Sequence, residues 1–215
     1  MSVEAVSEPT VFTVIRHGET AANRGGVIQG QTDVPLSPVG ERQARALGRR
    51  WRGRRFDAIY SSDLGRTLRT VELALPGQPT IPTPELREMD LGAWCGLDFA
   101  AIRERFPEDY AAFRSGDPDR RIAGGESRRE LVERTEKFFL AAARRHPGEE
   151  VLVVTHGGVL RALFTLVAGW SAAAPVVGNT AISVIRIDPE SGRRQLVVWN
   201  DTAHLEAPAL DGEAY

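Results

Sequence analysis

The sequence has very little cysteine and no long hydrophobic run. Its single cysteine, Cys95, cannot form a disulfide within the chain, which fits a reducing compartment. No stretch approaches the roughly 20 apolar residues that a membrane-spanning helix needs. The first ten residues contain two glutamates and no long apolar run, so we do not expect a signal peptide. These features predict a cytoplasmic protein with no membrane partner.

The chain also lacks a strong charge of either sign. Its net charge is -2 at pH 7, which gives no argument for binding nucleic acid. Lys137 is the only lysine among 27 basic residues. Such an excess of arginine reflects the codon usage of a GC-rich genome, so only arginines at particular positions in a motif indicate a function. With 215 residues and 42% hydrophobic content, we expect a single domain over residues 1–215, with a flexible N-terminus over residues 1–10.

Short apolar, β-branched runs alternate with helical patterns along the chain. Buried strands are expected at Val11–Ile15, Phe56–Tyr60 and Val151–Val154, with a short strand near Ile81 and a terminal hairpin of Ala181–Ile187 and Gln195–Trp199. Capping signals predict that helices begin after Ser37-Pro38, after Ser61-Ser62-Asp63 and at the Ser127/Glu130 capping box, the last of which runs to Arg145. Two further helices are expected over Asp98–Phe106, where Pro107 ends the helix, and over Val159–Ala168. The segment from Pro107 to Gly125 is expected to be a loop.

This alternation predicts an α/β fold with a mostly parallel central sheet covered on both faces. The terminal hairpin indicates that one strand runs antiparallel. In open sheets of this kind the ligand lies outside the carboxyl ends of the strands.

Three of the predicted strands lead into residues with strong chemistry. The first ends in Arg16-His17-Gly18, the second leads to Arg66, and the third ends in Thr155-His156-Gly157. A phosphoryl group carries about two negative charges and three acceptor oxygens, which suit arginine forks. A neutral imidazole can hold such a group covalently. The pattern therefore predicts a phosphoryl-transfer site.

The motifs that carry these residues resemble those of the histidine phosphatase superfamily, the phosphoglycerate mutase-like proteins. The resemblance covers most of the chain in order, through "RHGET" with Asn23, "QGQTDVPLSPVG", "YSSDLGRTLRT", "ELREMDLGAWCG", "GGES" and "VTHGG". It implies a three-layer α/β/α fold, no metal and no cofactor, and a small-molecule phosphate ester as partner. It leaves the oligomeric state open.

The resemblance also implies residue roles. His17 is expected to be the nucleophile, and Glu88, rather than the neighbouring Glu85, the proton donor. The expected catalytic set is His17, Glu88, Arg16, Arg66 and His156, and the expected substrate-binding set is Asn23, Gln29, Gly30 and Gly157. The chain departs from the family at Ala21-Ala22, where members often have Trp, and at Cys95, where they often have Glu.

Other kinds of site fit the sequence less well. Cys95 lacks the tight arginine-containing loop of a cysteine phosphatase and is expected to be inert. Gly25–Thr32 resembles a P-loop but has Gln31 in place of lysine and does not directly follow a strand. No short-spaced ligand pair supports a metal site. We expect His146 at the surface beside a helix C-terminus, and His204 in a structural role or as a distant pocket wall.

The sequence favours a phosphomonoester hydrolase that acts on small phosphorylated metabolites through a phosphohistidine. Two alternatives stay open: a cofactor-dependent phosphoglycerate mutase, and a non-catalytic phosphate-binding protein. Gly158 stands where the mutases carry Asn. Residues 101–123 are expected to form a variable, lid-like segment. Its arginines either bind a second anionic group of the substrate or form a solvated charged face; they are Arg103, Arg105, Arg114, Arg120 and Arg121.

Overall fold

The computed structural model describes residues 8–122, 124–170 and 174–205. Within them lies a six-stranded sheet of order β3-β2-β4-β1-β5-β6. Strands β1 to β4 pair in parallel, and β5 runs antiparallel to both of its neighbours, so the expected sheet with one antiparallel strand is confirmed. The strands are β1 (Thr10–Arg16), β2 (Ala58–Ser62), β3 (Ile81–Thr83), β4 (Glu150–Thr155), β5 (Ile182–Ile187) and β6 (Arg194–Asp201).

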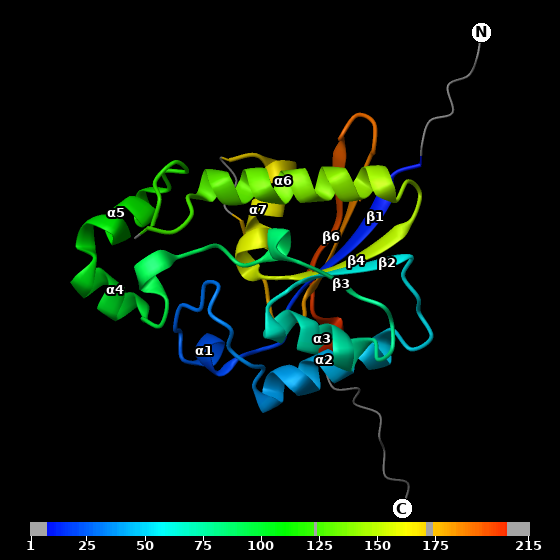
Figure 1. The fold of residues 1–215 in the computed structure, drawn as a ribbon, viewed down its shortest axis with the longest axis horizontal. Coiled ribbons are helices and arrows are strands. Elements are labelled where there is room, and N and C mark those ends of the chain that lie inside the picture. Colours follow the sequence, from blue (N-terminus) through cyan, green and yellow to red (C-terminus); the bar gives the residue numbers. More distant parts are fainter. Residues whose placement is uncertain (1–7, 123, 171–173, 206–215) are drawn as a thin grey trace, which may run out of the picture.

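Helices cover both faces of this sheet, as Figure 1 shows, with α6 and α7 on one side and α2 and α3 on the other. The described α-helices are α1 (Ala21–Arg24), α2 (Pro38–Arg50), α3 (Gly65–Ala74), α4 (Phe99–Arg105), α5 (Pro107–Ser115), α6 (Arg128–Arg145) and α7 (Gly157–Ala168), and the 3-10 helices are η1 (Pro84–Leu86), η2 (Gly92–Trp94) and η3 (Ala203–Leu205).

The alternating side chains of β1 show why the layers form. Phe12 faces α6, where its ring packs edge-on against Phe139 with centroids 5.1 Å apart. Ile15 belongs to the opposite cluster with Leu47 and Trp51 of the α2 segment. A strand buried on both faces is mostly apolar, and Val11–Ile15 is apolar at every position except Thr13. The three-layer α/β/α fold is confirmed.

Two expectations about helix boundaries were wrong. Pro107 ends α4 but also begins α5, because a proline at the first helical position lacks an N–H that has no partner there anyway. The segment after Pro107 is therefore partly helical rather than a continuous loop. Helix α3 is capped by no side chain of the Ser61–Asp63 run; instead the distant Asp33 carboxylate accepts from Gly65 N at 2.9 Å.

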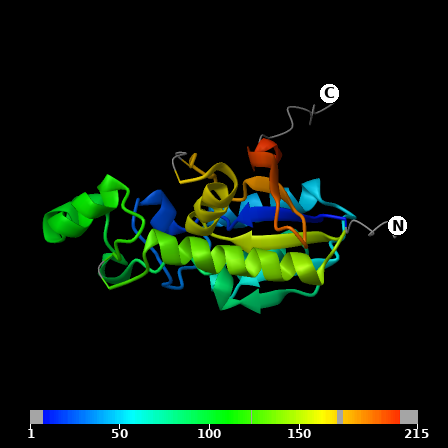
Figure 2. The same ribbon diagram turned by 90° about the horizontal axis from the view of Figure 1, so that it is seen from above.

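Helices α4 and α5 project beyond the end of the sheet toward which β1 runs (Figure 2). They are held there by buried Trp94, whose ring packs against Phe113 with centroids 5.4 Å apart, and by buried Ile102. Residues 1–7 of the N-terminus that we expected to be flexible lie outside the described residues, whereas Thr10 already belongs to β1.

Candidate active site

The carboxyl ends of β1 and β4 bring two histidines together. The strands pair in parallel with Arg16 opposite Thr155, so the next residue of each, His17 and His156, leaves the sheet at the same edge. Their ring centroids are 5.2 Å apart, and both side chains are almost fully buried. The pairing predicted from the two strand–His–Gly patterns is therefore present.

One hydrogen bond fixes the protonation of His17. Its Nδ1 lies 2.7 Å from the carbonyl oxygen of Gly18. A carbonyl oxygen only accepts, so Nδ1 carries the proton and Nε2 keeps its lone pair. Burial holds the pKa of His17 well below its ordinary value of 6.5, and the charges of Arg16 and Arg66 lower it further. The neutral imidazole therefore presents a free nitrogen lone pair.

Arg66 joins the second histidine to the loop after α1. Its Nε donates to Nδ1 of His156 at 3.3 Å, and its other nitrogens donate to the carbonyls of Gly30 at 2.8 Å and Thr32 at 2.7 Å. Since Nδ1 accepts, the neutral His156 ring carries its proton on Nε2. Burial holds the pKa of His156 well below 6.5, and the nearby His17 and Arg66 lower it further.

Two buried N–H groups at this edge of the sheet have no hydrogen-bond partner among the described residues. They are Nε of Arg16 and Nε2 of His156. Arg16 is anchored by a bond to Val177 O at 2.7 Å, and a Cβ on Gly157 would lie 3.6 Å from its Nε. Buried donors are normally paired, so unpaired ones beside a guanidinium indicate a place for an anion.

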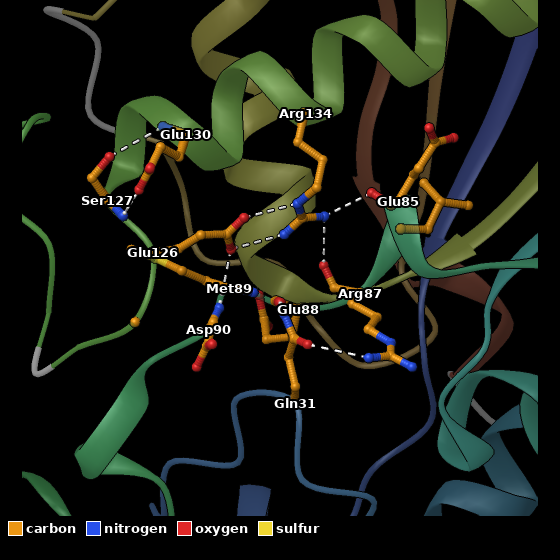
Figure 3. Close-up of polar contacts among 12 residues, drawn as sticks. Gln31, Glu85, Arg87, Glu88, Met89, Asp90, Glu126, Ser127, Glu130 and Arg134 are labelled. Atoms are coloured by element: carbon orange, nitrogen blue, oxygen red, sulfur yellow. Dashed lines mark hydrogen bonds and ion pairs between the residues drawn. The ribbon is translucent and has the colours of Figure 1, made fainter.

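Glu88 reaches the same edge from irregular backbone between η1 and η2. Its Oε1 accepts from Met89 N at 2.8 Å and from Gly158 N, in the first turn of α7, at 2.9 Å. Figure 3 shows the loop that carries Glu88, with Glu85 on it. Glu85 is exposed, as expected for the less favoured carboxylate.

Two of the remaining predicted residues, Asn23 and Gln29, belong to one polar network centred on Thr20. Asn23 accepts through Oδ1 from Thr20 N at 3.1 Å, and Gln29 accepts through Oε1 from the Thr20 hydroxyl at 2.9 Å. Both amides thus have their oxygens engaged. Gly30, with φ +49, turns its carbonyl to Arg66, and its missing Cβ would lie 2.6 Å from the Cys95 sulfur.

Sequence reasoning missed two residues of this network, Asn179 and Thr180. Asn179 Nδ2 donates to His17 O at 3.0 Å and to Asn23 Oδ1 at 3.3 Å, and Thr180 N donates to Arg16 O at 3.0 Å. Thr180 has φ +57, a conformation rare for a β-branched residue. The only signal was a polar Gly-Asn-Thr run before a strand, which is also typical of ordinary turns.

The other candidates lie elsewhere or are already engaged. His146 is mostly buried rather than at the surface, because it bridges the Tyr60 hydroxyl at 2.9 Å and Glu149 at 2.7 Å. His204 contacts the Thr180 hydroxyl at 2.9 Å, a structural position behind the site. All five lid arginines are exposed, and Arg120 and Arg121 pair with Asp109 and Glu130.

Metal-binding clusters and membrane-spanning helices are absent from residues 8–122, 124–170 and 174–205. In these ranges no three His, Cys, Asp or Glu side chains gather closely enough to hold a metal ion. None of the helices there combines the length and apolar character needed to cross a membrane.

Comparison with known proteins agrees with this geometry. The chain is 36% identical over 222 residues to the metal-independent phosphoserine phosphatase of Arabidopsis thaliana, covering 99% of this chain and 92% of the relative. It is 35% identical over 200 residues to phosphoglycerate mutase-like protein 4 of the same plant, covering 91% and 86%. Mycobacterial glucosyl-3-phosphoglycerate phosphatase superposes with a TM-score of 0.77 at 32% identity, covering 90% and 99%.

The profile of the histidine phosphatase superfamily, branch 1, matches residues 12–202. That range contains both histidines, both arginines and the Glu88 loop. The chain belongs to the histidine phosphatase superfamily.

Proposed function

We propose that this protein is a phosphomonoester hydrolase that forms a phosphohistidine on Nε2 of His17. The bond from Nδ1 to Gly18 O carries this proposal, because it leaves Nε2 as the only ring nitrogen with a free lone pair. Strand β1 and the short step to Gly18 hold that nitrogen in place. Preset orientation of a nucleophile lowers the barrier to attack by removing an ordering cost.

In the first step, the lone pair of His17 Nε2 forms a bond to phosphorus while the bond from phosphorus to the ester oxygen breaks. The unpaired Nε of Arg16 and Nε2 of His156, with the Arg66 charge behind them, neutralise the phosphoryl oxygens. Asn23, Gln29, Gly30 and Gly157 complete the pocket wall. Glu88, as the carboxylic acid, gives its proton to the departing alcohol oxygen.

In the second step, the Glu88 carboxylate takes a proton from water while the water oxygen attacks phosphorus. The bond to His17 breaks, and inorganic phosphate and neutral imidazole are released. Glu88 is then protonated again for the next cycle. One carboxyl group thereby serves as acid and as base.

The substrate class is a small phosphorylated metabolite. One relative is named a phosphoserine phosphatase, so phosphoserine belongs in the first panel of esters to be tested. We infer that α4 and α5 lie over the pocket mouth in a single-domain enzyme, with α5 and most of α4 belonging to the lid-like segment of residues 101–123. The single cysteine supports a cytoplasmic location.

One relative is named a phosphoglycerate mutase-like protein, which supports the mutase alternative. Gly158 stands where the mutases carry Asn, which argues against the mutase alternative. A Cβ at position 158 would lie only 2.0 Å from Glu88 Oε1, so a larger side chain has no room there. Two lid arginines are also paired with carboxylates rather than free to hold a bisphosphorylated intermediate.

The test is a coupled assay on the purified protein, with His17→Ala as the inactive control. We expect phosphate release from several monoesters and little interconversion of 3- and 2-phosphoglycerate, even with 2,3-bisphosphoglycerate supplied. Interconversion faster than phosphate release would make the mutase assignment correct. If neither reaction occurs but the protein still binds phosphate, it is a non-catalytic phosphate-binding protein.

A further inference from the structure

The Glu88 loop, residues Glu85–Asp90, depends on side chains from elsewhere for its shape. Beyond η1 it belongs to no helix or strand, so its backbone polar groups need outside partners. The Thr155 hydroxyl donates to Leu86 O at 2.8 Å, and Gln31 Nε2 donates to Glu88 O at 3.2 Å. The partners of Glu85 O, Arg87 O and Asp90 N come from one ion pair, Arg134 with Glu126.

Arg134 of α6 holds the part of the loop that precedes Glu88. Its NH1 nitrogen donates to the carbonyls of Glu85 at 2.7 Å and Arg87 at 3.0 Å, as Figure 3 shows. Its Nε and NH2 nitrogens donate to the two oxygens of Glu126, both at 2.9 Å. The Arg134 side chain is 21% exposed, so most of it is fixed within the protein.

Glu126 holds the part of the loop that follows Glu88. Its Oε2 accepts from Asp90 N at 3.1 Å, and its own backbone N donates to Asp90 O at 2.8 Å. The next residue, Ser127, is the N-cap of α6 in a capping box with Glu130, which fixes Glu126 at the start of the helix. The ion pair therefore grips the loop on both sides of Glu88.

We propose that Arg134 and Glu126 are positioning residues that hold the Glu88 carboxylate against Gly158 N, an inference that rests on the proposed function. The pair is bidentate, and the other hydrogen bonds that its side chains make among the described residues end on the loop backbone. Loss of Arg134 frees the carbonyls of Glu85 and Arg87. The acid then samples positions away from the leaving oxygen, which slows only reactions that need its proton.

The experiment compares Arg134→Gln, Glu88→Gln and the double variant on phosphoserine and p-nitrophenyl phosphate. The measured quantity is kcat/KM, which reports steps up to departure of the alcohol. A poor leaving group needs protonation, whereas p-nitrophenolate leaves with little help. We expect Arg134→Gln to lower kcat/KM for phosphoserine by about 10- to 100-fold, because small misplacements of catalytic groups have costs of this size. The value for p-nitrophenyl phosphate should change far less.

Non-additivity is the readout that a merely structural role would not produce. In the Glu88→Gln background, Arg134→Gln should cause almost no further loss on phosphoserine, since residues that act through one group are not additive. Arg194→Gln is the matched control. Arg194 of β6 has a 19% exposed side chain and pairs with Glu136 of α6 rather than with the Glu88 loop, and we expect its loss to leave both rates nearly unchanged.

Circular dichroism and thermal unfolding establish that each variant is folded. Should Arg134→Gln fail to fold, Arg134→Lys carries the same test, because lysine keeps the charge but lacks the guanidinium fork that holds Glu126 and the loop together. Equal losses on both esters, or additive losses in the double variant, would overturn the positioning role alone. A folded wild-type protein that hydrolyses neither ester would overturn the proposed function as well.

Discussion

Glu88 and Gly158 are in direct contact across 70 positions of sequence. The carboxylate oxygen Oε1 lies 2.9 Å from the backbone nitrogen of Gly158, at the positive end of helix α7. A Cβ on Gly158 would lie 2.0 Å from that oxygen, much closer than two non-bonded atoms can approach. The absence of a side chain at position 158 is therefore a condition for this placement of the carboxylate.

Replacing Gly158 with alanine should displace Glu88 and slow the hydrolysis of poor leaving groups. We expect Gly158→Ala to lower kcat/KM for phosphoserine by about 10- to 100-fold, with a smaller effect on p-nitrophenyl phosphate. Gly25→Ala is the control, because Gly25 has φ -79 and its nearest neighbour would lie 3.5 Å from the new Cβ. An unchanged phosphoserine rate in Gly158→Ala would show that the acid does not need this contact.

Stability should fall as the pH is lowered from 6.5 toward 5. Burial holds the folded-state pKa values of His17 and His156 below 6.5, so the unfolded chain binds more protons in this range. Their contribution is complete above about pH 6.5 and is lost as the pH falls toward the folded-state values. Urea unfolding of His17→Gln should show a pH slope smaller by up to about 1.4 kcal/mol per pH unit. The same slope in wild type and variant would contradict a neutral, buried His17.

Asn179 should affect phosphate binding through Asn23. Its Nδ2 donates to Asn23 Oδ1 and His17 O, so Asn179→Asp places a carboxylate against two acceptor oxygens. We expect about tenfold weaker inhibition by inorganic phosphate, the size of effect typical of losing a hydrogen bond and leaving buried groups unpaired. The inhibition constant of phosphate for Asn179→Ala should lie between those for Asn179→Asp and the wild type. Equal inhibition constants in all three proteins would remove Asn179 from the pocket.

Chelators should leave the activity unchanged. Arg16 and Arg66 place two fixed cations beside His17, and an imidazole nucleophile needs no metal-activated water in the first step. Phosphate release is measured after incubation with EDTA and dialysis, and again after addition of Mg²⁺ or Zn²⁺. A loss that is restored by one of these ions would show that a metal takes part.

Much of the fold was predictable because its signals are local. The β-branched runs that became β1 and β4, the Ser37-Pro38 start of α2 and the Ser127/Glu130 capping box each specify an element within a few residues. The first two carry the site histidines at their ends. For the same reason, His17 and His156 could be placed side by side from the sequence.

The wrong predictions involve either a partner that is distant in sequence or a local signal that fits two structures. The cap of α3 comes from Asp33, which is 32 residues away from Gly65, and no local pattern indicates it. Pro107 has two meanings in sequence, since it can follow one helix and begin another. Arg134 likewise looks like any exposed arginine on an amphipathic helix, and only the folded chain places it against the Glu88 loop.

The bonds from Arg66 to the carbonyls of Gly30 and Thr32 have a thermodynamic consequence for ligand binding. They order an irregular loop as the chain folds, so the entropy cost of that ordering falls on folding rather than on binding. A small anion that meets this pocket thus gains its contacts without first rigidifying the protein. Under the proposed mechanism we expect inorganic phosphate, the reaction product, to bind without this cost as the substrate does, so its accumulation should oppose turnover.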